Sequence, residues 1–380
     1  MPFISKLPEL GTTIFTSISA LSAKYNAINL GQGFPEYSGN EILHNFVFQA
    51  IQEGKNQYAP MAGDIQLRNE IAQKQFLAYN VQYNADTEIT ITAGATQAIF
   101  TALATIIQQN DEVIIFDPSY DCYAPSIRLF GGIPIPVILS APHFAIDWDQ
   151  VKQKISTKTK AIIFNNPHNP LARVFDMDDI KMLAQIVEEN NLYLIADEVY
   201  EHLVFDNIKF HSVCTIETLK NRSFIIYSFG KTLHNTGWKI GYCLAPAYLM
   251  LEFRKIHQYI VFSVNTPVQH ALARFLTQNN DYIHLPNWYQ NKRNIFTKAM
   301  QHSKFKLLPS QGTYFILADY SKISNKTDVD FSVELIKEVG VASIPISVFY
   351  QNKLDQKILR FCFAKNENTL LKAAEKLCQI

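Results

Sequence analysis

Two lysines and a serine in one short segment have side chains that could carry chemistry. The segment 227–242 reads YSFGKTLHNTGWKIGY and continues from the apolar run 224–226. Lys231 therefore comes just after a predicted strand, where a lysine has two interpretations. Its amine extends into solvent, as most lysine amines do, or it is desolvated, has a lowered pKa and attacks a carbonyl to form a Schiff base. Ser228 and Lys239 flank it and could bind an anion.

Three other places in the chain have residues of this kind. Asp197 ends the otherwise uncharged segment LYLIAD, so it either caps the next segment or faces a cation such as a protonated cofactor ring nitrogen. Gly94-Ala95-Thr96 lies between a predicted strand and a predicted helix; it is a simple turn or an anion site built from free N–H groups. Arg360 lies inside the apolar run ILRFCFA, so its charge needs a partner there. The partner is either an acidic residue of the chain or the carboxylate of a ligand, which the planar guanidinium can bind with two parallel hydrogen bonds.

Short apolar runs alternate with longer amphipathic segments through the middle of the chain. We predict strands at 88–92, 112–116, 161–165, 192–197, 223–228 and 240–245, with helical patterns at 96–109 and 178–191. This alternation predicts an α/β fold with a mostly parallel sheet. Such a sheet binds ligands beyond the carboxyl ends of its strands, which is where most of the residues named above fall.

The pattern changes after about residue 278. Helical patterns at 287–301, 330–339 and 367–378 flank strand-like runs at 312–320 and 357–364. We therefore predict a large domain over 41–277, a smaller α+β domain over 278–380, and an N-terminal segment, 1–40, that completes the smaller domain.

The composition excludes several classes of protein. Lys plus Arg and Asp plus Glu number 34 each, so no net charge favours nucleic acid or a membrane surface. The 5 cysteines are scattered without a CxxC pair, which argues against a disulfide framework or a zinc site. We expect no metal. The first 15 residues lack the pattern of a secretory signal, and no apolar run is long enough to span a membrane. A cytoplasmic protein is the expectation.

In this order along the chain, the residues resemble the class I and II, fold-type I aminotransferases that depend on pyridoxal 5′-phosphate. The segment SFGKTLHNTGWKIGY resembles the lysine signature of that family, and NNPHNP resembles its Asn-Pro-x-Asn-Pro turn. The resemblance covers essentially the whole chain. It is greatest for the branch with bacterial methionine aminotransferase and kynurenine aminotransferase, through INLGQGFPEY, DPSYDCYAP, ADEVYEH, FSVNTP and RFCFAK.

The resemblance implies a role for each matching position. Lys231 would hold the cofactor through a Schiff base and move protons, Asp197 would keep the pyridine nitrogen protonated, and Tyr200 would contact the phenolic oxygen. Asn169 would contact the same oxygen and Tyr120 would stack on the ring. The positions expected at the phosphate are Gly94, Ala95, Thr96, Ser228, Lys239 and, from the neighbouring subunit of a homodimer, Tyr58.

The substrates implied are an amino acid and a 2-oxo acid in a ping-pong reaction. Arg360 would bind the α-carboxylate, with the backbone of Gly33 and the side chain of Asn169 nearby. Phe15 and Phe262 supply either an apolar substrate pocket or ordinary packing. We therefore expect neutral substrates: methionine first, then phenylalanine, tyrosine, leucine and histidine.

The sequence departs from the family pattern at two places. Leu171-Ala172 follows Pro170 where the family has Thr-Gly, which puts the local turn geometry in doubt. Lys239 stands where the signature has arginine. The positive charge remains, but a lysine ammonium cannot make the two parallel hydrogen bonds of a guanidinium group.

Two rival functions stay open at this stage. A C–S β-lyase acting on cysteine conjugates or cystathionine would use the same Lys231, Asp197 and Arg360. A regulator that binds the cofactor without catalysis would usually add a DNA-binding domain, and it would have little need of Lys231. No basic recognition segment is visible in the sequence.

Overall fold

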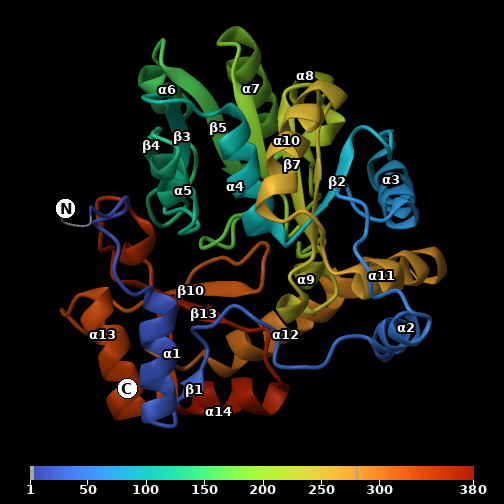
Figure 1. The fold of residues 1–380 in the computed structure, drawn as a ribbon. Coiled ribbons are helices and arrows are strands. Elements are labelled where there is room, and N and C mark those ends of the chain that lie inside the picture. The colour runs from blue at the N-terminus through green and yellow to red at the C-terminus, as the bar shows by residue number, and fades with distance from the viewer. Residues whose placement is uncertain (1–3, 280) are drawn as a thin grey trace.

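A computed structural model describes residues 4–279 and 281–380, and Figure 1 shows its fold. Residues 1–3 of the predicted N-terminal segment and residue 280 of the predicted small domain lie outside the described residues. The helices are α1 (Ile14–Lys24), α2 (Glu41–Gln52), α3 (Ile65–Tyr79), α4 (Ala95–Ile106), α5 (Tyr123–Leu129), α6 (Trp148–Lys154), α7 (Met177–Glu189), α8 (Glu217–Lys220), α9 (Phe229–Thr232), α10 (Ala247–Ile260), α11 (Thr266–Gln278), α12 (Leu285–Ala299), α13 (Asp328–Glu334) and α14 (Glu367–Leu377). Among these residues, no helix is long and apolar enough to cross a membrane.

A seven-stranded sheet is the centre of the upper part of the molecule (Figure 1). Its strands, in spatial order, are β2 (Ile89–Thr92), β8 (Gly241–Leu244), β7 (Ser223–Ser228), β6 (Tyr193–Asp197), β5 (Thr159–Asn165), β3 (Glu112–Asp117) and β4 (Ile133–Ile138). Strand β8 runs antiparallel to both of its neighbours, and every other pairing is parallel. The predicted α/β fold with a mostly parallel sheet is confirmed.

Both faces of this sheet are buried, which explains why its strands are almost continuously apolar. Along β3, Val113 and Ile115 pack into the cluster that contains the inner faces of α4 and α10. The alternate residues Ile114 and Phe116 pack into the larger cluster on the other face. Successive side chains of a strand point to opposite faces, so each face of the sheet needs its own layer of helices.

The edge strand β4 was not predicted. Its sequence, IPIPVI, contains Pro134 and Pro136, and proline cannot donate to a strand ladder. The pattern therefore argues against a central strand. The structure places it at the edge of the sheet, where a proline residue is tolerated because one side of the strand needs no partner.

The C-terminal part of the chain forms a smaller antiparallel sheet in the lower part of the molecule (Figure 1). Its strands are β12 (Ile344–Pro345), β13 (Ile358–Cys362), β10 (Phe315–Asp319) and β9 (Lys306–Leu307). The N-terminal strand β1 (Ile28–Asn29) pairs with β11 (Val341–Ala342). Directly after β1, the carbonyl of Leu30 accepts a hydrogen bond from the N–H of Cys362, in β13, at 2.7 Å. The N-terminal segment thus packs on the C-terminal sheet, and the exact domain limits stay a prediction.

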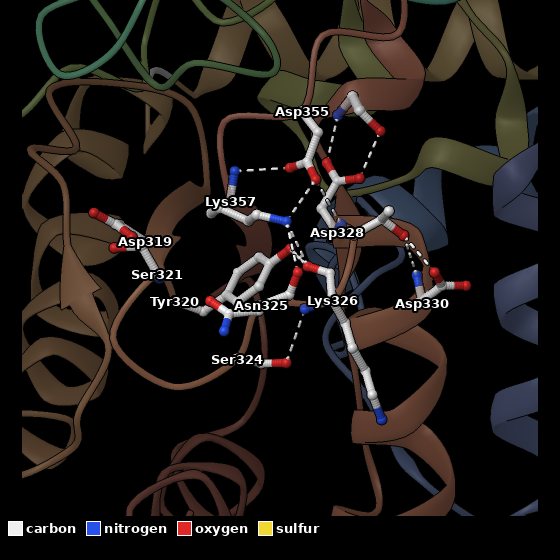
Figure 2. A network of polar contacts seen from close by, with 12 residues as sticks. Asp319, Tyr320, Ser321, Ser324, Asn325, Lys326, Asp328, Asp330, Asp355 and Lys357 are labelled. Atoms are coloured by element: carbon white, nitrogen blue, oxygen red, sulfur yellow. Dashed lines mark hydrogen bonds and ion pairs between the residues drawn. The ribbon is translucent and has the colours of Figure 1, made fainter.

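A network of hydrogen bonds and ion pairs connects the loops next to the smaller sheet, as Figure 2 shows. The carboxylate of Asp328 accepts from the N–H of Ser347 at 2.7 Å and from its hydroxyl at 2.6 Å. The ammonium of Lys357 donates to the carbonyl of Lys326 at 2.7 Å and pairs with Asp355 at 3.1 Å. The network holds the start of the segment 347–351. The end of this segment contacts the large sheet, where the N–H of Gln351 donates to the carboxylate of Asp117.

The turn at Leu171-Ala172, where the sequence departs from the family pattern, contains a strained residue. Ala172 is buried and has φ of 57°, a left-handed conformation that costs an L-residue about 1–2 kcal/mol. We expect Ala172→Gly to raise the free energy of unfolding by about 0.5–1 kcal/mol, measured from the midpoint of urea denaturation. As a control, Ala184→Gly within α7 should lower it by about 1 kcal/mol. Equal destabilisation by both changes would contradict the interpretation.

Candidate functional site

A cavity of about 180 Å³ lies beyond the carboxyl ends of the strands of the large sheet. Strands β5, β6 and β7 are neighbours and end at Asn165, Asp197 and Ser228, so these side chains meet at one edge. The predicted residues that line the cavity are Gly94, Ala95, Thr96, Tyr120, Asn169, Asp197, Tyr200, Ser228, Lys231 and Lys239. The fold therefore brings together every predicted cofactor residue except Tyr58.

Lys231 projects into this cavity from the short helix α9. Its desolvation, with a smaller contribution from the positive charges of Lys239 and Arg360, lowers the pKa of its amine to about 8. About a tenth of the amine is then uncharged at pH 7, far more than for an ordinary lysine, and the uncharged form is the one that acts as a nucleophile or proton acceptor. The amine donates to the hydroxyl of Tyr314 at 2.7 Å.

Asp197 faces the same cavity from the end of β6 and is 4% exposed. Its carboxylate accepts from the hydroxyl of Tyr123 at 2.5 Å. Burial raises the pKa of this carboxyl to about 6. A buried carboxylate that is charged above this pH is stabilised by a cationic partner in the cavity.

A second group of residues that line the cavity is suited to an anion. Helix α4 begins directly after Gly94. Because glycine has no side chain to cap the helix, the backbone N–H groups of the first turn stay free to bind an anion. Lys239 lies beside them: a Cβ atom added at Gly94 would come within 3.2 Å of the lysine Nζ. Ser228 precedes α9 and also makes no side-chain cap, which leaves its hydroxyl available.

Arg360 lies beside the cavity and is linked to it through Asn169. Its guanidinium is 1% exposed and donates to the side-chain oxygen of Asn169 at 2.7 Å. It also lies 3.8 Å from the ring centroid of Phe315. Its Nε is buried and has no hydrogen-bond partner among the described residues. An arginine with an unused donor next to a polar cavity is suited to bind a carboxylate.

Two further predicted substrate residues lie near Arg360. The ring of Phe15 is 5.6 Å from the guanidinium carbon of Arg360, and it packs at 5.9 Å from Phe349. Gly33 approaches Phe315 so closely that an added Cβ would lie 2.7 Å from the phenylalanine ring. The carbonyl of Gly33 accepts from the hydroxyl of Tyr314 at 2.6 Å.

Tyr58 and Phe262 do not reach this cavity within one chain. Their rings contact each other at 5.2 Å on the surface, and they are 80% and 54% exposed. Any part that they play in a site of this kind requires a second copy of the chain.

The structure adds two residues that sequence reasoning missed, Tyr123 and Tyr314, and it gives a contact to Asn165, which the sequence placed only at the end of a predicted strand. Tyr123 donates to Asp197, and Asn165 accepts from the N–H of Asn169 at 2.8 Å. Nothing in the pattern around the two tyrosines distinguishes them from core aromatic residues.

The buried carboxylate next to Asp197 predicts a pH dependence of stability. Glu198 accepts from Ser212 at 2.6 Å and from Tyr227 at 2.7 Å. Burial nevertheless raises its pKa from 4.5 to about 7. Between these values the folded chain binds more protons than the unfolded chain. The free energy of unfolding therefore falls as the pH rises, by about 3 kcal/mol at about 1.4 kcal/mol per pKa unit.

Glu198→Gln tests this dependence because it removes the charge and preserves the shape of the side chain. Other buried carboxyls also titrate, so the quantity to compare is the difference in unfolding free energy between pH 5 and pH 7.5, for the parent and for the variant. The variant should lose about 2 to 2.5 kcal/mol of this difference, because the interval leaves out the lowest part of the titration. The matched change at the exposed Glu188 of α7 should leave it unaltered. An unchanged difference in Glu198→Gln would refute the assignment.

The fold and the cavity define the chain as a fold-type I transferase. The model of the family "Aminotransferase class I and II" matches residues 25–377. Methionine aminotransferase from Escherichia coli is 48% identical over 377 residues, which cover 99% of this chain and 98% of that protein. A crystal structure from the same organism, described as identifying a methionine aminotransferase function, superposes with a TM-score of 0.98, 48% identity and 100% of each chain covered.

Kynurenine–oxoglutarate transaminase from Dictyostelium discoideum is 34% identical, with 98% of this chain and 95% of that protein covered. The chain belongs to the aminotransferase class I and II family. It is an aminotransferase.

Proposed function

We propose that this chain binds pyridoxal 5′-phosphate and transfers the amino group of a neutral, apolar or aromatic amino acid to a 2-oxo acid in a ping-pong reaction. Methionine is the favoured donor. The observation that carries the proposal is the single cavity that gathers Lys231, Asp197 and an anion site, with Arg360 linked to it through Asn169. The 48% identity to a methionine aminotransferase supports the choice of donor.

The residues of the cavity fit this cofactor in three respects. The free N–H groups of α4, with Lys239 and Ser228, suit a phosphate group. Gly94 has φ of 78°, a backbone conformation that residues with a side chain rarely adopt, and the end of Lys239 lies close to it. The buried carboxylate of Asp197 suits a protonated ring nitrogen. The amine of Lys231 suits a carbonyl carbon.

When bound, the cofactor supplies the electron sink that stabilises a carbanion at the substrate Cα. Each protein group then has a simple task. Asp197 would keep the proton on the ring nitrogen by its negative charge, and Asn169 and Tyr200 would donate to the phenolic oxygen. The free amine of Lys231 takes the proton from the substrate Cα, for which a pKa of about 8 is well placed.

Arg360 binds the α-carboxylate of the substrate in this proposal. The guanidinium lies among the rings of Phe15, Phe315 and Phe349, at 5.6, 3.8 and 5.1 Å. Aromatic surroundings suit an uncharged side chain on the substrate, such as the thioether of methionine. They support methionine and aromatic amino acids over dicarboxylic donors.

The proposal includes a cytoplasmic homodimer with shared sites. Tyr58 and Phe262 form an exposed aromatic pair, and Tyr259, three residues before Phe262 in the chain, is 86% exposed. Large exposed aromatic side chains of this kind are typical of an interface. We infer that a second copy covers them, so that Tyr58 reaches the phosphate site and Phe262 the substrate pocket of the other subunit.

The test is the visible absorption spectrum of the purified chain with pyridoxal phosphate, before and after methionine is added without an oxo acid. Stoichiometric conversion to the pyridoxamine form, with release of a 2-oxo acid, is the expected result. A band that returns while ammonia and a thiol accumulate would indicate the C–S β-lyase, which the family and its relatives do not favour. The absence of any band would refute the proposal.

A further inference from the structure

Tyr314 lies directly behind the amine of Lys231. Its side chain is fully buried, and its hydroxyl takes part in two short hydrogen bonds. The amine of Lys231 donates to it at 2.7 Å, and it donates to the carbonyl of Gly33 at 2.6 Å. The hydroxyl thus connects the helix that carries the lysine with the N-terminal segment beside the proposed substrate pocket.

The chemistry of these groups determines the direction of each hydrogen bond. The carbonyl of Gly33 can only accept, so the single hydroxyl proton of Tyr314 is used there. The tyrosine oxygen therefore faces Lys231 as an acceptor. An amine that donates one N–H in that direction has its remaining tetrahedral positions, including the lone pair of the neutral form, free for the cavity.

The acceptor is also rigidly placed. The ring of Tyr314 packs edge-on against Tyr200 at 5.3 Å and against Phe315 at 4.8 Å. Lysine has a long, flexible side chain with many rotamers. A fixed acceptor selects one of these rotamers, which a reacting group needs if it is to stay near its target.

We propose that Tyr314 is a positioning residue for Lys231, which holds the amine next to the reacting carbon whenever that amine is not bonded to the cofactor. The inference rests on the proposed function, in which the free amine carries the proton. It has a second consequence. An oxygen acceptor favours the ammonium form, so Tyr314 opposes the effect of burial on the lysine pKa.

Tyr314→Phe removes only the hydroxyl and keeps the packed ring. The first measurement is made on the full chain without cofactor: reductive methylation of Lys231 by formaldehyde and a borohydride reagent, followed by mass spectrometry across a pH series. We expect the midpoint of this reaction to move to lower pH by about one unit. This readout does not depend on transamination.

The second measurement is the half-reaction with methionine in the cofactor-loaded variant. We expect kcat to fall by about tenfold to a hundredfold while KM stays within about twofold, because substrate binding is untouched. The matched control is Tyr320→Phe. Tyr320 is also buried and donates to a backbone carbonyl, that of Lys326 at 2.9 Å (Figure 2), and it is not part of the cavity lining.

Each outcome separates the two proposals. A shifted methylation midpoint with a slowed half-reaction supports the role of Tyr314. A midpoint or a rate that matches Tyr320→Phe overturns it. If the parent chain takes up no cofactor or does not convert methionine, the proposed function fails, whatever the methylation profile of the variant.

Discussion

Replacing Lys231 by alanine should lower the rate of transamination by about four orders of magnitude or more. In the proposed function, the change removes both the amine that would hold the cofactor and the group that would move the proton. A positioned acid–base group alone contributes about 10²–10⁴-fold. The measurements are the steady-state rate with methionine and a 2-oxo acid, and the absorption band of the bound cofactor. Added methylamine should restore part of the rate, because it replaces the missing amine.

Two variants control this experiment. Lys231→Arg keeps the positive charge but cannot give up its proton at neutral pH, so it should be as inactive as the alanine variant. Lys152→Ala, on the exposed surface of α6, should leave the rate unchanged. Wild-type rates in Lys231→Ala would sink the assignment of this residue.

Replacing Arg360 by lysine should raise KM for methionine by about tenfold to a hundredfold, with a smaller change in kcat. Lysine keeps the charge but loses the planar fork and the hydrogen bond to Asn169. Removal of a binding interaction that is equally strong in the ground state and the transition state changes KM alone. Arg360→Leu should have a larger effect, since truncating one partner of a buried charge pair costs about 2–5 kcal/mol.

A substrate analogue makes this experiment specific. The amine that corresponds to methionine without its carboxylate, 3-(methylthio)propylamine, cannot use Arg360 in the proposed manner. Its slow reaction should therefore be affected little by Arg360→Lys, and the two changes together form a double-mutant cycle. An equal loss for methionine and for the analogue would mean that Arg360 supports the fold and does not bind the carboxylate.

The amino-acid sequence by itself determined six of the seven strands of the large sheet and the reactive residues at their ends. Runs such as 223–228 are apolar throughout because both faces of the sheet are buried, so they can be identified locally. Helices can be read in the same way from their periodicity. Edge strand β4 could not, since its prolines contradict the local rule and only its place at the edge permits them.

Only the tertiary structure decided which distant groups touch. Arg360 meets Asn169 because β13 of the smaller sheet packs beside the ends of the larger one, and no local pattern encodes a contact across that separation. The same holds for Tyr314, which resembles any core aromatic residue until its hydroxyl is found between Lys231 and Gly33. Sequence patterns report burial and backbone geometry, whereas the chemistry of a site depends on contacts that form when the elements pack.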